Sequence, residues 1–310
     1  MGGMDISLSI VGLSPTGPSP VDTLVGTVAK LRDEGFRRVW MAQLPYDADL
    51  PTVLGIVFRE VDGIEIGSGV IPIQVQHPMQ LAQRALTLSL ISGGRFKLGI
   101  GMSHRLIVEG MWGATWDKPV RQMREYLDAL QPVLDGQSAD ATGEFWTARG
   151  ALQIPAPAPE VYIAALGPQM LKLAGRRTRG TLTWMTGPKT LAGHVVPTLR
   201  EAAAEAGRAE SDVWVAASLP VSVTDDVDGA RKQAAKEFAV YGTLPSYRAM
   251  LDREGYAGPE DAAIIGDEAT VSQRLDELSA VGVNEFTASV FDASSEARAR
   301  TRALLVSKQS

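Results

Sequence analysis

Eight short runs of apolar, largely β-branched residues recur along the chain, separated by stretches with helical periodicity. Runs that are apolar through their whole length are typical of strands buried on both faces, as in parallel sheets. Alternation of such strands with helices predicts a parallel sheet with helices packed on it. The predicted strands are Ile6–Val11, Arg38–Ala42, Glu65–Val70, Phe96–Gly101, Glu160–Ala165, Gly180–Met185, Val213–Val223 and Asn284–Val290.

The stretches between these runs have the spacing of amphipathic helices. Val21, Leu24, Val28 and Leu31 follow one another at steps of 3, 4 and 3, which places their side chains on one helix face. Gly35 comes just after them, where a glycine commonly ends a helix. Eight strand–helix units in one chain favour a closed (β/α)8 TIM barrel over an open, doubly wound sheet.

Two segments interrupt the regular alternation. Residues 135–159 are rich in Gly, Ala and Pro and lie between the fourth predicted helix and the fifth strand, and residues 241–267 precede the eighth strand. The chain has no Pro-rich or Ser-rich linker that would divide it. We therefore expect an α/β protein with one barrel domain over residues 1–310 and insertions before the fifth and eighth strands.

The composition argues against several kinds of site. The sequence has no cysteine, so it can form neither a disulfide nor a zinc–thiolate or iron–sulfur site. Its three histidines, His77, His104 and His194, lie far apart, without the spacing of a histidine metal site. His77 precedes Pro78 at an expected helix start, which favours capping, and His194 lies within an expected helix, where we expect it to be structural or exposed.

The charge and the hydropathy limit the kinds of partner that we expect the chain to bind. The formal charge of −6 and the sequence pI near 5.2 disfavour binding to nucleic acid. The chain has no apolar stretch of roughly 18 residues that could span a membrane. It also starts without the basic and apolar segments of a signal peptide. We expect a cytoplasmic protein that acts on a small molecule.

In a (β/α)8 barrel the chemistry lies where strands end and the following loops begin. After the fifth predicted strand, Gly167 and Pro168 stand at the turn and a helix begins at once. A helix N-terminus with free N–H groups, here those of Gln169 and Met170, favours an anion such as phosphate. The alternative is an ordinary turn with proline at the first helical position.

Glycines also interrupt the end of the third predicted strand. Gly67 and Gly69 lie inside an otherwise apolar run, and glycine within a strand marks a bulge or a close approach of ligand to backbone. The alternative is a bend at a barrel corner.

The fourth and sixth strand ends offer side chains for chemistry. Gly99 and Gly101 suggest a dinucleotide turn, but His104 stands where that motif needs its third glycine. His104 titrates near neutral pH and is a candidate acid or base, unless it is a surface or capping residue. Trp184 and Met185 can form a wall beside a flat ring, unless they pack in the core.

At this point the chain resembles a known family. The sequence GSGVIP, followed by HPMQLAQRALTLSLISGGRFKLGIGMSH, is similar to the central signature of the bacterial luciferase-like monooxygenases. The segments GFRRVWMAQ and PEVYIAALGPQMLKLAG match that family's second-strand and fifth-strand regions. WMTGP and VYGTLPSYRAMLDREG look closest to the branch that uses the deazaflavin coenzyme F420.

The resemblance implies a dimeric barrel that holds a flavin or deazaflavin ring at the carboxyl ends of its strands. A bulge with a non-prolyl cis peptide bond supports the ring, which places that bond at Gly69–Val70. The resemblance leaves His104, found above at the fourth strand end, and Gln43 as the candidate catalytic residues, and Trp184 and Met185 as candidates for lining the substrate. It assigns coenzyme binding to Gln43, Gly69, Val70, Ile71, Gly101, Ala165, Leu166, Gly167, Gln169 and Met170.

The sequence departs from this family at one informative place. The F420-dependent alcohol and sugar-phosphate dehydrogenases often end the second strand in Asp-His, but here Gln43 and Leu44 stand there, and Leu44 cannot move a proton. Their acidic residue after the fourth strand is replaced by His104. We expect an F420-dependent oxidoreductase, a homodimer, that moves a hydride to or from a small organic substrate. The alternatives are an FMN-dependent luciferase-like monooxygenase and a non-catalytic flavin-binding or deazaflavin-binding barrel.

Overall fold

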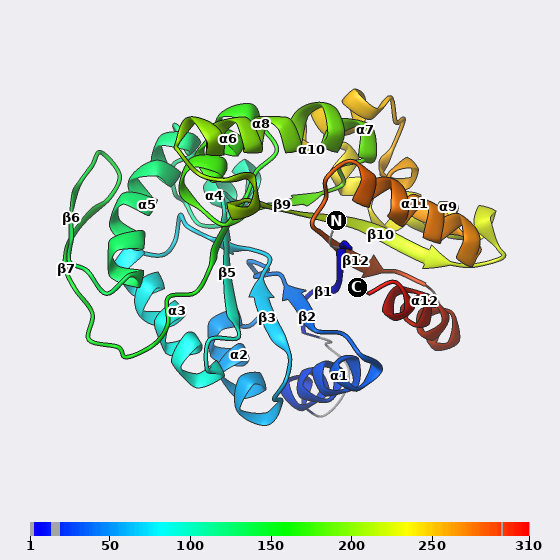
Figure 1. Cartoon of the computed structure of the whole chain (residues 1–310), viewed down its shortest axis with the longest axis horizontal. Helices are drawn as coiled ribbons and strands as arrows, with labels where there is room; N and C mark the ends of the chain where they lie inside the picture. Colours follow the sequence, from blue (N-terminus) through cyan, green and yellow to red (C-terminus); the bar gives the residue numbers. More distant parts are fainter. Residues whose placement is uncertain (1–2, 14–18, 293, 310) are drawn as a thin grey trace. The chain divides into compact units, whose positions relative to one another are not determined.

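The computed structural model describes residues 3–13, 19–292 and 294–309 (Figure 1). Eight parallel strands form a closed barrel, which confirms the predicted fold. Each predicted strand is present, and its ends differ from the prediction by at most two residues. The barrel strands are β1 (Asp5–Ile10), β2 (Arg38–Met41), β3 (Glu65–Ser68), β5 (Phe96–Gly101), β8 (Val161–Ala164), β9 (Gly180–Trp184), β10 (Trp214–Val223) and β12 (Glu285–Val290).

Helices alternate with these strands. Proline occupies the first position of several of them, where its missing N–H removes no helical hydrogen bond. The helices are α1 (Pro20–Glu34), α2 (Leu50–Glu60), α3 (Pro78–Ser92), α4 (Arg105–Gly110), α5 (Pro119–Leu134), α6 (Pro168–Arg177), α7 (Pro188–Thr190), α8 (Val196–Glu205), α9 (Val227–Glu237), α10 (Pro245–Glu254), α11 (Glu268–Ala280) and α12 (Ser295–Ser307). The shorter elements are β4 (Ile71–Pro72), β6 (Ala139–Thr142), β7 (Thr147–Gly150), β11 (Ile264–Gly266), the π-helical turn η1 (Leu191–Val195), and the 3-10 turns η2 (Glu210–Asp212), η3 (Ala239–Gly242) and η4 (Pro259–Asp261).

The chain divides into two compact units. The first unit comprises residues 11–33 and 40–164, and the second comprises residues 1–10, 34–39 and 165–310. In the first unit, α2, α3 and α5 pack in succession around β3 and β5 (Figure 1). The antiparallel hairpin of β6 and β7 lies beside α5, within the segment expected to be the first insertion.

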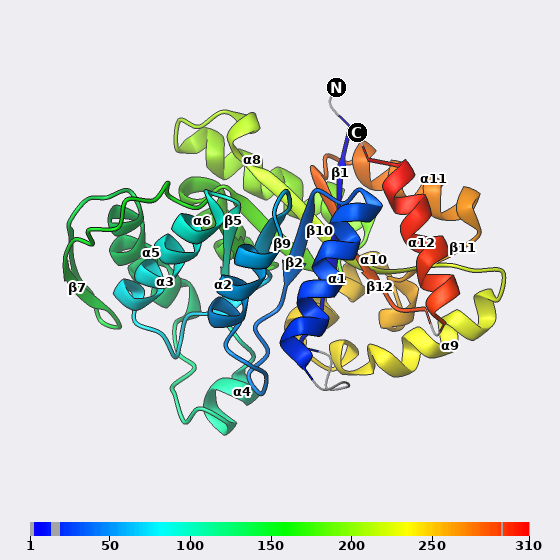
Figure 2. The ribbon, with the colours of Figure 1, turned by 90° about the horizontal axis from the view of Figure 1, so that it is seen from below.

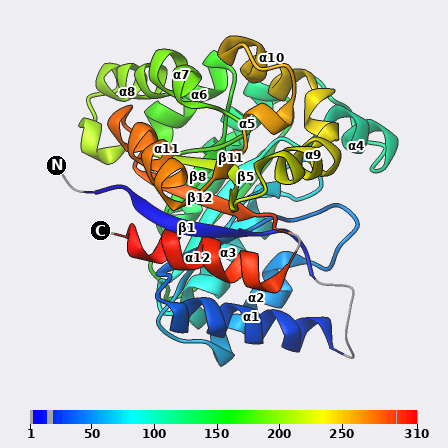
Figure 3. The same cartoon turned by 90° about the vertical axis from the view of Figure 1, so that its right-hand side faces the viewer.

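In the second unit, α6 and α8 lie side by side, and α10 packs against α7 (Figure 1). Figure 3 shows α12 running along β12, and its contacts extend to β10. The segment expected to be the second insertion contains η4, α10 and β11. Among the described residues, no helix is both long and apolar enough to cross a membrane.

Packing explains one of the two glycines that interrupt the predicted third strand. A Cβ atom on Gly67 would lie 2.2 Å from the ring of Trp40, a distance that no side chain tolerates. Trp40 in turn packs edge-on against Tyr162, with 5.3 Å between the ring centroids. Gly67 is therefore required by the core of the first unit, and the search for a ligand site moves to Gly69.

Candidate functional site

The carboxyl end of β3 carries the cis peptide bond that the family resemblance implies. The bond between Gly69 and Val70 is cis, although Val70 is not a proline. The backbone before it is fixed, because Ser68 Oγ donates to the Gly99 carbonyl and accepts from the Gly99 N–H, both at 2.9 Å. Gly69 N–H donates to the Met41 carbonyl at 2.8 Å. Ser68 is fully buried, yet Gly69 is exposed, so the cis peptide presents bare backbone to solvent.

The neighbouring strand leaves room for this bulge. A Cβ atom on Gly101, the last residue of β5, would lie 2.7 Å from Val70 Cγ2 and 3.3 Å from the Ala164 Cβ. Only glycine at this position lets Val70 lie where it does. Ile71, the next residue after the bulge, is buried and pairs with Ile100 of β5. The bulge is thus a platform held by two neighbouring strands.

His104 lies directly beyond the end of β5, at the N-cap position of α4. Its side chain makes no capping hydrogen bond to the helix, so the capping alternative does not account for it. Partial burial lowers the pKa of His104 below its usual value, and the ring is therefore neutral at pH 7. Gln74 supports this loop, because its Oε1 accepts from the Ser103 N–H at 3.4 Å and its Nε2 lies 3.7 Å from Met102 Sδ. Figure 2 shows α4 projecting from its unit.

Gln43 follows β2 and is held by its own loop. Its Oε1 accepts from the Leu50 N–H at 2.6 Å, and its Nε2 donates to the carbonyls of Leu44 at 3.1 Å and Ala48 at 3.4 Å. The structure therefore shows the side-chain amide organising the loop between β2 and α2. A contact of this amide with a coenzyme stays a prediction.

In the second unit, the turn after β8 has the form of an anion site. α6 begins at Pro168, and Gly167 at its N-cap, like Gln169, is exposed. A Cβ atom on Gly167 would meet nothing within 4 Å, and its φ of −77° suits any residue, so the folded chain itself does not require glycine here. Open space beside exposed helical N–H groups fits a phosphate, which would come close to the backbone.

Hydrogen bonds to other segments hold the two residues that precede this turn. Ala165 is buried, and its carbonyl accepts from Thr181 Oγ1 at 3.3 Å. Leu166 is half-buried, and its carbonyl lies 2.8 Å from Nε2 of His194. Met170 is buried in the first turn of α6, so only its backbone could reach a ligand.

Trp184 and Met185 differ in exposure. Met185 is fully buried at a φ of 54°, and its N–H donates to the Ser218 carbonyl at 3.2 Å. It lacks the exposed surface that the sequence had led us to expect of a substrate-lining residue. Trp184 is half-buried and packs edge-on against Phe238 and Tyr241, at centroid distances of 5.9 and 5.5 Å. Its indole nitrogen is buried and has no hydrogen-bond partner.

The other two histidines each contact a backbone group. His77 caps α3, because its Nδ1 accepts from the Met79 N–H at 3.2 Å, which confirms the capping prediction. His194 is buried on η1, and sequence reasoning missed its bond to Leu166 because nothing in a helix-like segment marks such a contact. Among the described residues, no three His, Asp or Glu side chains form a group that could hold a metal ion.

Comparison with known proteins gives one consistent result. The sequence model of the luciferase-like monooxygenase family matches residues 6–302. The 5,10-methylenetetrahydromethanopterin reductase of Archaeoglobus fulgidus is 30% identical over 233 residues, covering 74% of this chain and 68% of that protein.

Two solved structures share the fold at low sequence identity. The coenzyme F420-dependent tetrahydromethanopterin reductase of Methanopyrus kandleri aligns with a TM-score of 0.81 at 21% identity, over 99% of this chain and 98% of that one. The oxygenating constituent of 3,6-diketocamphane monooxygenase of Pseudomonas putida, solved with FMN, aligns with a TM-score of 0.78 at 17% identity, over 99% and 98%.

Proposed function

Because the chain belongs to the luciferase-like monooxygenase family, we propose that it is a coenzyme F420-dependent oxidoreductase acting on a small organic substrate. The observation that carries the proposal is the exposed backbone at Gly69, set between buried Ser68 and buried Ile71. Exposed backbone at this place leaves a planar ring room to approach. When bound, the coenzyme would accept or supply a hydride.

In the first unit, the chain would support the coenzyme ring from one side. Gly69 and Val70 would contact it through the cis peptide, and the backbone of Ile71 would extend that surface. Gly101 acts by leaving space for Val70, as the 2.7 Å approach of a Cβ atom indicates. Gln43 would shape the adjoining loop, since its amide already bonds the backbone there.

In the second unit, the start of α6 would bind the coenzyme phosphate. The exposed N-terminus supplies N–H groups from Gly167, Gln169 and Met170, and the helix dipole favours a negative charge there. Ala165 and Leu166 would contribute as the backbone that sets the turn.

His104 is the proposed proton-transfer residue. Its lowered pKa leaves a neutral ring at pH 7, which can take a proton from a substrate hydroxyl during oxidation. In the direction of reduction, the ring would first take a proton from solvent and then deliver it to the substrate. Trp184 would bound the substrate with the exposed part of its indole ring.

The FMN-dependent monooxygenase is the second candidate, because an FMN-bound member shares the fold over nearly the whole chain. One comparison of two reactions separates the candidates. An F420-dependent enzyme oxidises reduced F420, or reduces oxidised F420, without oxygen when a substrate panel is supplied. An FMN-dependent one consumes oxygen with reduced FMN and leaves F420 unchanged. Activity only in the second reaction would overturn the F420 proposal.

A further inference from the structure

His194 is a buried polar residue that the proposed chemistry does not use. It lies on the π-helical turn η1, between α7 and α8, and its Nε2 is 2.8 Å from the Leu166 carbonyl oxygen. A carbonyl oxygen can only accept, so Nε2 carries the hydrogen and donates. π-helical turns within helices often occur at functional sites.

The accepting carbonyl belongs to the peptide group that joins Leu166 to Gly167. In a trans peptide the N–H points opposite to the C=O. A donor on the carbonyl side therefore fixes the plane of the group and directs the Gly167 N–H away from His194. Pro168, the next residue, has no N–H, so this direction decides whether Gly167 adds an N–H to those that Gln169 and Met170 can offer to an anion.

The C-terminal half of α6 is held by contacts that do not involve His194. A Cβ atom on Gly175 would lie 2.3 Å from the Leu199 carbonyl oxygen, so α6 and α8 are in close backbone contact there. Arg208 Nη1 also donates to the Gly175 carbonyl at 2.6 Å. Loss of the His194 bond would therefore release the first turn of α6 and leave its second half in place.

We propose that His194 is a positioning residue that orients the Gly167 turn toward a phosphate, and thereby sets the preference for phosphate-bearing over phosphate-free coenzyme. The inference rests on the proposed function. A purely structural histidine would lower the affinity for both coenzyme forms equally, because the ring-binding platform at Gly69 contains no part of α6.

The test compares two polar substitutions of similar size. In His194→Gln the amide nitrogen reaches the position of Nε2 and can still donate to Leu166, whereas in His194→Asn it stops short. His77→Gln is the matched control, because His77 caps α3 in the first unit. For each variant, the dissociation constants of FMN and riboflavin are measured by fluorescence, and likewise those of F420 and its phosphate-free deazaflavin.

The expected result is a phosphate preference in the unmodified protein that falls about tenfold in His194→Asn, the change expected for one lost hydrogen bond to a charged group. His194→Gln keeps most of the preference, and His77→Gln keeps all of it. An unchanged ratio in His194→Asn, or a parallel loss for both forms, overturns the role of His194 alone. If the unmodified protein binds none of the four compounds, the proposed function fails as well.

Discussion

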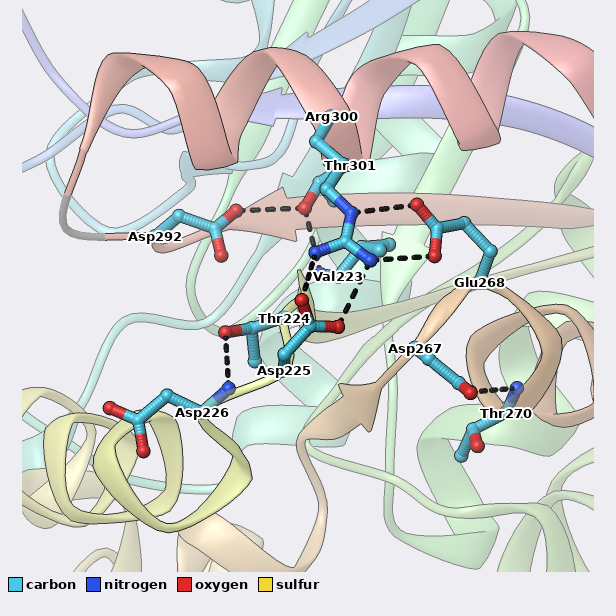
Figure 4. Close-up of polar contacts among 10 residues, drawn as sticks. All are labelled: Val223, Thr224, Asp225, Asp226, Asp267, Glu268, Thr270, Asp292, Arg300 and Thr301. Carbon is cyan, nitrogen blue, oxygen red and sulfur yellow. Dashed lines mark hydrogen bonds and ion pairs between the residues drawn. The ribbon is translucent and has the colours of Figure 1, made fainter.

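The carboxyl ends of β10 and β12 differ from those of β3 and β5 in whether buried polar contacts cover them. At β10 and β12, in the second unit, a buried polar network closes the strand ends. Asp292, just after β12, accepts from Ser222 Oγ and from Thr301 Oγ1, the latter at 2.9 Å. Thr301 also accepts from the Val223 N–H at 2.8 Å, which fastens α12 to β10. Figure 4 shows the contacts of Thr301 with Asp292 and Val223 beside the pairing of Arg300 with Asp225 and Glu268.

At β3 and β5, in the first unit, the strand ends are open. Gly69 is exposed, and Gly101 has no side chain that could cover the adjoining bulge. His104 follows without a capping bond to its helix. The comparison teaches that buried hydrogen bonds stabilise one pair of strand ends, whereas the other pair is followed by exposed backbone at Gly69. Substitutions should then separate into those that change catalysis and those that change unfolding.

The largest effect is expected at His104. His104→Gln should lower turnover by about 10²–10⁴-fold, since the amide cannot transfer a proton, while the melting temperature changes little. Steady-state kinetics with F420 and the best substrate of a panel provide the measurement. His77→Gln, which changes the cap of α3, should keep full turnover. Unchanged turnover in His104→Gln would remove this residue from the mechanism.

The next largest effect is expected on stability, at the carboxyl ends of β10 and β12. Asp292→Ala leaves two buried hydroxyl groups without their acceptor and should lower the free energy of unfolding by about 3 kcal/mol. Urea denaturation measures this loss, and coenzyme affinity at 25 °C should be unchanged. Asp226→Ala is the control at the exposed cap of α9 and should cost about 1 kcal/mol. A strong loss of coenzyme affinity in folded Asp292→Ala would erase the contrast between the two regions.

A smaller structural effect is expected at Gly101. Gly101→Ala forces Val70 to move and should lower coenzyme affinity about tenfold, with about 1–3 kcal/mol of destabilisation from overpacking. Gly26→Ala, in α1, meets nothing within 4 Å and should be neutral or slightly stabilising. Calorimetric titration and thermal unfolding test both variants. Equal affinities for Gly101→Ala and the unmodified protein would separate the bulge from coenzyme binding.

The smallest effect is a pH dependence. Because burial lowers the pKa of His104 in the folded state, the unfolded chain binds its proton first as the pH falls. The contribution of the neutral ring to stability is complete above the unfolded pKa of about 6.5, and it is lost as the pH falls through the folded value. Urea midpoints between about pH 7.5 and pH 5 should therefore decline less in His104→Gln. Parallel pH curves would contradict the direction of this shift.

The sequence predicted the barrel well because its signal is local. Each buried strand is a continuous apolar run, and each amphipathic helix repeats within its own segment, so neither needs knowledge of distant residues. The cis peptide at Gly69–Val70 followed from the family resemblance and is present. The cap at His77 followed from its position before Pro78.

Contacts between distant segments could not be predicted in this way. Ser222 and Asp292 are 70 residues apart, and no periodicity in the sequence indicates that their side chains are in contact. The position of His194 against Leu166 depends on a π-helical turn that sequence spacing does not specify. The structure gives the Gln43 amide three partners in the local backbone, and it buries Met185 at a positive φ; sequence spacing specifies neither.

Equilibrium titration of the purified protein with oxidised F420, followed by deazaflavin fluorescence, tests the central claim most directly. Saturable binding of one coenzyme per chain, with a dissociation constant in the micromolar range or below, is the result the account predicts. Absence of binding to F420, and to FMN in the same experiment, would contradict the assignment of the exposed backbone at Gly69 as a coenzyme platform.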